Sequence, residues 1–230
     1  MFIGHYAAAL AAKRLAPKTS LGTLVFGAQF LDLLWPLLLL LNVEHFRIAP
    51  GDTRFTPLDF YDYPISHSLL AVIGWAAVVG VLYFGLNRGF RRDHEGNARA
   101  AWVMAALVMS HWVLDAVVHR PDLPLRPGGT TLVGLGLWNS VAGTLVLETV
   151  LYGAAVVAYL RGTAADGKGR VRFWVYIFVI YAFYAASAFG PPPPTVGAVA
   201  WAGMGQWLFV LWAWWVDRPS RGATGVEASA

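Results

Sequence analysis

The sequence contains no cysteine and few charged residues. The absence of cysteine among 230 residues excludes disulfides and thiolate chemistry, whichever compartment the protein occupies. Charged residues make up only 13% of the chain, against about 25% in an average soluble protein. Hydrophobic residues make up 57%, and the mean hydropathy is +0.54. No polar stretch is long enough for a soluble module, so the composition predicts a single-domain integral membrane protein that resides in the lipid bilayer.

The excess of basic residues does not indicate a nucleic-acid partner. The net charge of +4 comes from short basic loops, which membrane proteins use to set their orientation. If the N-terminus is inside, the inner segments hold 13 of the 17 lysines and arginines. The segments 42–64 and 119–137 then face outward and contain the other four. This asymmetry predicts that both termini are cytoplasmic.

Six apolar runs are long enough to cross a membrane, because about 20 residues at about 1.5 Å each span roughly 30 Å of hydrocarbon. They cover residues 20–41, 65–86, 98–118, 138–160, 173–190 and 197–216. The opening MFIGHYAAALAA is too short to cross and has no basic stretch before its apolar part, so we expect a retained half-helix or re-entrant segment. The predicted fold is an all-α polytopic helix bundle over residues 1–216, followed by a disordered cytoplasmic tail at 217–230.

Six ionisable residues lie within the apolar runs or at their ends. They are Asp32, His67, His111, Asp115, His119 and Glu148. An unpaired ionisable group in the membrane costs several kcal/mol, so such groups indicate function unless a structural reason accounts for them. Asp32 has no such reason, since it stands between two leucines, and Pro36 beyond it can kink the helix and open room.

Three of the six also have structural interpretations. His67 can be an interfacial histidine beside a helix cap at Ser66. His119 stands next to Arg120 at a helix end and fits an interfacial residue better than a ligand. Glu148 can be a protonated side chain bonded to a neighbouring helix. His45 and His94 fall in loops, where the sequence offers them no partner.

Spacing and depth bring several of these residues together. His111 and Asp115 are four residues apart and therefore share one helical face. Counted along the spans at about 1.5 Å per residue, Asp32, His67, His111, Asp115 and Glu148 fall within a slab about 10 Å thick. His5 joins them only if the opening half-helix dips inward from Lys13. We therefore predict a metal site of His5, Asp32, His67, His111 and Asp115.

Such a ligand set suits a divalent metal, most simply zinc. Zinc held by histidines and carboxylates with one position open lowers the pKa of a bound water toward about 7. Glu148 or a spare aspartate is the candidate general base, and Glu148 is the candidate catalytic residue. In the stretch YPISHS we expect Ser66 to cap the helix, His67 to be a ligand, and Ser68 to be a supporting or substrate-facing hydroxyl.

The order of these residues resembles that of a known family. An early His5, Asp32 in the first full span, the HS pair at His67 and the HWVLD run at His111 are similar to the YdjM-like inner-membrane proteins, described as membrane-bound metal-dependent hydrolases. The resemblance covers about residues 1–120 and implies a bacterial inner-membrane protein with a His/Asp metal centre. The chain departs from the family pattern in two ways, since Asp32 lacks an adjacent aspartate and YPISHS lacks an arginine.

The sequence thus favours a metal-dependent hydrolase of a lipid-like ester or phosphoester. A site in the outer half of the membrane suits a substrate with a lipid tail and a polar head. The alternatives are a small proton- or ion-coupled transporter, in which the same residues relay protons or bind an ion, and a non-catalytic membrane protein. No inverted repeat accompanies the polar residues, which disfavours the transporter. A non-catalytic membrane protein would leave Asp32 and Asp115 unexplained.

Overall fold

Six membrane-length helices dominate the computed structural model, which describes residues 1–88, 94–163 and 167–218. They are α2 (Leu21–Leu40), α4 (Leu69–Arg88), α5 (His94–Val118), α6 (Val141–Gly162), α7 (Gly167–Phe189) and the α8–α9 pair (Val196–Met204 and Gln206–Val216). Each coincides with a predicted apolar run to within a few residues, and the all-α membrane bundle is confirmed. The predicted tail beyond residue 218 lies outside the described residues.

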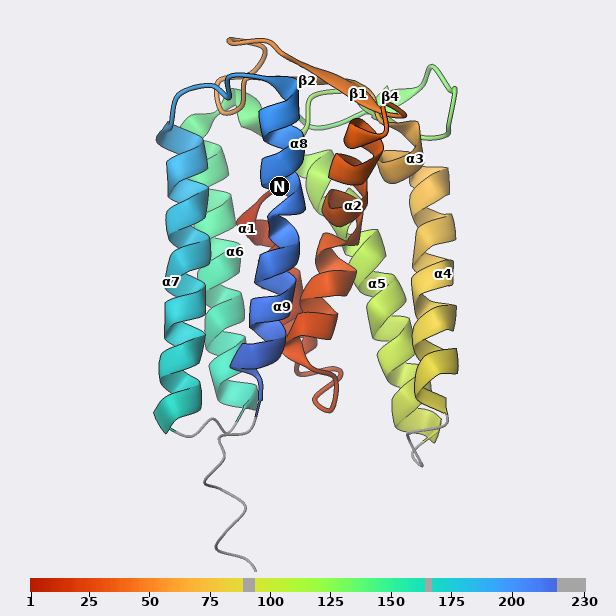
Figure 1. The fold of residues 1–230 in the computed structure, drawn as a ribbon, viewed down its shortest axis with the longest axis vertical. Coiled ribbons are helices and arrows are strands. Elements are labelled where there is room, and N and C mark those ends of the chain that lie inside the picture. Colours follow the sequence, from red (N-terminus) through yellow and green to blue (C-terminus); the bar gives the residue numbers. More distant parts are fainter. Residues whose placement is uncertain (89–93, 164–166, 219–230) are drawn as a thin grey trace, which may run out of the picture.

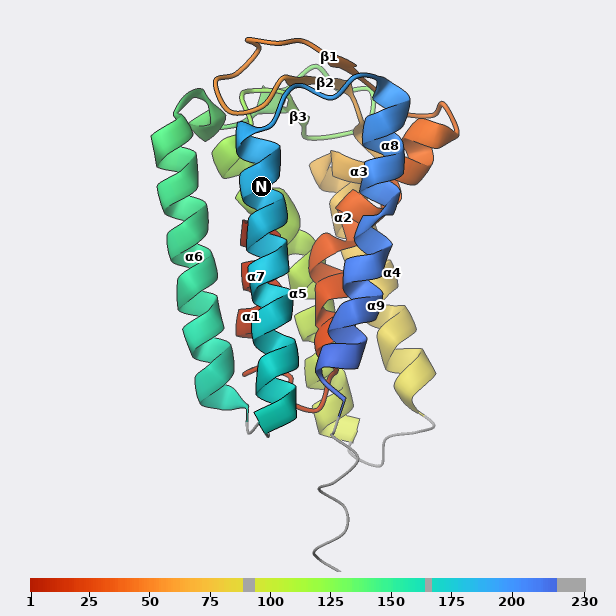
Figure 2. The same cartoon turned by 60° about the vertical axis from the view of Figure 1, so that its left-hand side comes forward.

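The outward faces of these helices are apolar. Large side chains such as Val81 on α4, Trp102 on α5 and Phe178 on α7 are 70% to 77% exposed. Apolar exposure on this scale marks a surface that meets lipid or a partner rather than water. Both views place α6 and α7 on one flank and α4 on the other, with α1 and α2 between them (Figures 1 and 2).

The short helix α1 (Ile3–Ala12) is the inward-dipping half-helix that the sequence predicts. Most of its residues are buried, and it packs against α2, α5 and α6. The N-terminal end of the chain is buried within the bundle, in the upper half of both views (Figures 1 and 2). A ten-residue helix rises only about 15 Å, so it can deliver His5 to the interior without crossing the membrane.

Helix α2 carries Pro36 within its length and passes close to α8 there. A Cβ at Gly203 of α8 would lie 2.5 Å from Cγ of Pro36, so only glycine permits this approach. Small residues at such contacts are typical of helices that pack in membranes.

The second span does not begin as a single helix. A four-residue turn, α3 (Pro64–His67), precedes α4, and the extended Ser68 separates the two. The amide of Ala71 donates to the Ser68 hydroxyl at 3.4 Å. Ser68 therefore caps α4, and the predicted cap at Ser66 is wrong, because the chain turns sharply between Ser66 and Leu69.

Two small antiparallel hairpins cover one end of the bundle (Figure 1). Strand β1 (His45–Ile48) pairs with β2 (Leu58–Asp62), and β3 (Leu123–Pro124) pairs with β4 (Leu132–Val133). A single-turn 3₁₀ helix, η1 (Leu137–Asn139), follows them. We call residues 42–63 and 119–140 the loop cap.

Candidate metal centre

His111 and Asp115 form the base of the site on α5. Both are buried, and the Nε2 atom of His111 lies 3.2 Å from Oδ2 of Asp115. The spacing of four residues places both side chains on the interior face of the helix, as expected. The two side chains are therefore in position to contact the same metal ion.

Asp32 and His67 complete a set of four close ligand atoms. Oδ1 of Asp32, on α2, lies 3.6 Å from Nε2 of His111 and 3.7 Å from Nε2 of His67, on α3. Nε2 of His67 is also 3.7 Å from Oδ2 of Asp115. Ligands about 2.0–2.1 Å from a tetrahedral zinc lie about 3.3–3.4 Å apart. Four of the six distances among these atoms, 3.2 to 3.7 Å, are close to that spacing. Among the described residues, two groups of three have ligand atoms that all lie within 4.8 Å of one another: Asp32, His67 and His111, and His5, His111 and Asp115.

The hydrogen bond of the His111 ring leaves Nε2 available to a ligand. Nδ1 lies 2.7 Å from the carbonyl oxygen of Ala28, which can only accept, so Nδ1 carries the hydrogen. Nε2 is buried and has no hydrogen-bond partner within the described chain. Histidines that bind metals characteristically donate their other ring N–H to a carbonyl or carboxylate in this way.

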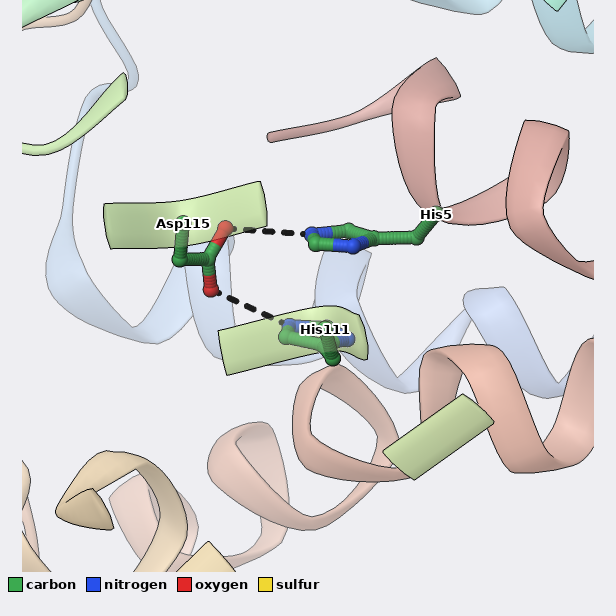
Figure 3. A group of neighbouring side chains, drawn as sticks. All are labelled: His5, His111 and Asp115. Carbon is green, nitrogen blue, oxygen red and sulfur yellow. Dashed lines mark hydrogen bonds and ion pairs between the residues drawn. The ribbon is translucent and has the colours of Figure 1, made fainter. Parts of the chain in front are cut away.

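His5 contacts the second carboxylate oxygen of Asp115. Its Nε2 lies 3.1 Å from Oδ1 of Asp115, whereas His111 faces Oδ2 (Figure 3). The amino group of Met1 also donates to Oδ1. The His5 and His111 rings stack with their centroids 3.5 Å apart. His5 therefore lies within the cluster, and its contact with Oδ1 orients the carboxylate whose Oδ2 faces the other ligands.

Asp32 has the most exposed side chain of the cluster. That side chain is 25% exposed, whereas the side chains of His5, His67, His111 and Asp115 are at most 5% exposed. Of these five side chains, Asp32 is therefore the one that is accessible from the protein surface.

Glu148 lies at the beginning of α1. Its Oε2 accepts the backbone amides of Phe2 at 2.9 Å and Gly4 at 3.2 Å, and its Oε1 is buried without a hydrogen bond in the described part of the chain. A carboxylate at a helix N-terminus satisfies amides that have no partner within the helix. The observed contacts thus make Glu148 an anchor for the helix that carries His5, and its role as general base stays a prediction.

Glu44 is a residue that sequence reasoning missed. It is 1% exposed, accepts the amides of Ile65 and Ser66 through Oε1, and accepts the Ser66 hydroxyl through Oε2. The Ser66 oxygen also lies 2.7 Å from Nδ1 of His67. Ser66 thus supports His67, and Ser68, predicted to have that supporting role, is the helix cap. In the sequence, Glu44 is one polar residue of a loop, and only folding places it over α3.

The remaining histidines of the loop cap lie outside the cluster. His119 is buried, 2.9 Å from Asp122 and close to Trp138, and the prediction that it is not a ligand stays a prediction. His45 pairs with Asp62 at 2.7 Å across the β1–β2 hairpin. The expectation that His45 has no partner is therefore wrong, because hairpin register is not evident from a loop-like sequence.

The chain matches no family model, no curated protein and no solved structure with which it was compared. The site must therefore be interpreted from its own chemistry.

Proposed function

We propose that Asp32, His67, His111 and Asp115 bind one divalent metal, zinc being the simplest choice, with His5 holding Asp115 in place. The observation that carries this proposal is the convergence of two carboxylates and two histidine Nε2 atoms, with four of their distances between 3.2 and 3.7 Å. The Met1 amino group pairs with Oδ1 of Asp115, whereas Asp32 and Oδ2 of Asp115 face the two histidines. Buried carboxylates need a compensating charge, and a metal ion bound between these atoms supplies it.

The activity that we propose is metal-dependent hydrolysis of a lipid-like ester or phosphoester. Bound zinc lowers the pKa of water sufficiently to supply a nucleophile near neutral pH. Asp32 is the proposed ligand that is accessible from the protein surface. The resemblance of residues 1–120 to YdjM-like hydrolases includes the four proposed ligands and His5. This resemblance supports the same reaction class.

An apolar cavity of about 1050 Å³ supports a substrate with a hydrocarbon tail. Alanines of α1, α5 and α6 contribute much of its wall, and it includes Gly4 and Leu114, the residues just before His5 and Asp115. The cavity therefore shares α5 with the ligand set and α1 with the supporting His5. Its size falls at the upper end of the usual range for small-molecule sites, roughly 300–1,000 Å³.

Elemental analysis of the detergent-purified protein tests the metal directly. We expect about one equivalent of zinc in the parent, loss of that metal in His111→Ala, and retention in the matched control His119→Ala, which removes a buried histidine outside the set. Size-exclusion profiles establish that both variants are folded. Absence of metal in the parent, together with proton-coupled uptake into vesicles, overturns the hydrolase in favour of the transporter.

Hydrolysis assays in mixed micelles then identify the bond that is cleaved. Phospholipid and neutral carboxylic-ester substrates with labelled tails separate phosphoesterase from esterase activity. We expect turnover of one class that stops on chelation and returns with zinc. If zinc-loaded protein cleaves neither class, the proposed reaction is wrong even though the metal site stands.

We further propose a bacterial inner-membrane location with the basic ends of the helices in the cytoplasm and the loop cap outside. Met1 itself lies inside the bundle, where its amino group contacts Asp115. Reporter fusions after residues 55 and 128, both in the loop cap, should be external. Fusions after residues 95 and 168 should be cytoplasmic, because the basic residues gather on that side. Reversal of either pair contradicts this orientation.

A further inference from the structure

His67 is carried by an unusual element, since α3 has only four residues and ends at the extended Ser68. A single turn of helix is not rigid by itself, because too few hydrogen bonds form to offset the ordering of its residues. The His67 ring nevertheless presents Nε2 to both Asp32 and Asp115, at 3.7 Å from each. Something other than the turn must fix the ring.

Glu44 fixes the turn from outside. Its Oε1 accepts the amides of Ile65 at 2.6 Å and Ser66 at 2.7 Å, which are among the amides that a short helix leaves unsatisfied. Its Oε2 lies 2.5 Å from the Ser66 hydroxyl. Glu44 and Ser66 are 1% and 0% exposed, so water does not compete for these bonds.

Counting hydrogens then determines the state of His67. A carboxylate only accepts, so the single hydroxyl hydrogen of Ser66 is directed to Glu44. The Ser66 oxygen can therefore offer only a lone pair to Nδ1 of His67, which lies 2.7 Å away. Nδ1 must carry the hydrogen, and in the neutral ring Nε2 is left with a free lone pair.

We propose that Glu44, acting through Ser66, is the positioning residue for His67, holding the ring in the tautomer and orientation that place the Nε2 lone pair between Asp32 and Asp115. The assignment of this lone pair as a metal ligand rests on the proposed metal centre. The tautomer itself does not. Supporting hydrogen bonds of this kind commonly change metal affinity by about 10–100-fold when they are lost.

The tautomer is measured first, in metal-free protein with ¹⁵N-labelled histidine, by NMR in detergent at a pH at which the ring is neutral. The His67 signal is assigned from its loss in His67→Gln. We expect the Nδ1–H tautomer in the parent and in Ser66→Thr, which keeps the hydroxyl. We expect a mixture or the Nε2–H tautomer in Ser66→Ala. An Nε2–H tautomer in the parent overturns the proposal without any variant.

Zinc affinity is measured next, by competition with a chromophoric chelator. Ser66→Ala and Glu44→Gln should weaken binding by about 10–100-fold, and Ser66→Thr should remain near the parent. Ser68→Ala is the matched control, because it removes the neighbouring hydroxyl that caps α4 without touching the His67 ring. Unchanged affinity and tautomer in Ser66→Ala contradict the positioning role. A parent that binds no zinc but keeps the Nδ1–H tautomer contradicts only the proposed metal centre.

Discussion

Two groups of buried carboxylates in this protein are compensated in different ways. In the loop cap, Asp59 is 2% exposed and forms ion pairs with Arg47 and Arg120. Arg120 also reaches Asp52 at 2.6 Å and Asp122 at 3.4 Å. Guanidinium groups are permanent cations, so Asp52, Asp59 and Asp122 are paired with cations of the loop cap itself.

Within the bundle, the balance is different. Across the described ranges, no lysine or arginine forms an ion pair with Asp32 or Asp115, and the partners of these carboxylates are His5, His67, His111 and the amino group of Met1. Hydrogen bonds to other groups direct the free Nε2 atoms of His67 and His111 toward the carboxylates. The loop-cap carboxylates are thus paired with permanent cations, whereas those of the bundle face histidines and one amino group, and the proposed metal centre rests on this difference.

The largest expected effect comes from removing Asp115. Asp115→Ala should abolish the stabilisation by metal, because binding only to the folded state adds about 4 kcal/mol when free metal is about 1,000 times Kd. Thermal denaturation with and without chelator measures the stabilisation by metal. The parent should lose stability on chelation, and the variant should not. Asp122→Ala in the loop cap is the matched control and should keep the response of the parent. If Asp115→Ala responds to chelator as the parent does, Asp115 is not a ligand of the metal.

A smaller effect is expected in the loop cap. Arg120→Ala leaves Asp59 with Arg47 alone, and loss of hydrogen bonds between charged groups costs about 2 kcal/mol. The variant should denature at a lower temperature than the parent, and its zinc content and response to chelator should be unchanged. Loss of zinc in this variant would show that the carboxylates of the loop cap and the cluster in the bundle are coupled, and would contradict their independence.

The smallest effect concerns Tyr63, whose hydroxyl donates to Asp122 at 3.0 Å. Burial, with the nearby charge of Asp122, raises the pKa of Tyr63 well above its usual value. Above about pH 10 the unfolded chain therefore releases this proton before the folded chain does, and stability falls as the pH rises. Tyr63→Phe should cost about 1 kcal/mol near neutral pH.

The same variant should also show a shallower loss of stability than the parent as the pH rises above about 10, measured by denaturation at a series of pH values. The other buried tyrosines are present in both proteins, so they cancel in the difference. Identical slopes would mean that Tyr63 ionises equally in the folded and unfolded chains.

The membrane bundle could be predicted from the sequence because its cause is local. Long apolar runs must form helices in lipid, where every backbone polar group has to be satisfied within the segment. The inward half-helix could also be predicted, since a ten-residue apolar stretch cannot cross the membrane. The shared face of His111 and Asp115 followed from helical periodicity alone.

Contacts between segments distant in the sequence were decided only by the tertiary structure. The depth of Asp32 and His67 could be counted along their spans, but their lateral meeting with His111 depends on how α2, α3 and α5 pack. Ser66 supports His67 and Ser68 caps α4, the reverse of the expected roles, because the helix is broken at Ser68. No residue pattern marks this break. The support from Glu44 and from the Ala28 carbonyl arises in the same way, because a hydrogen-bond partner more than 20 residues away is chosen by packing and not by spacing.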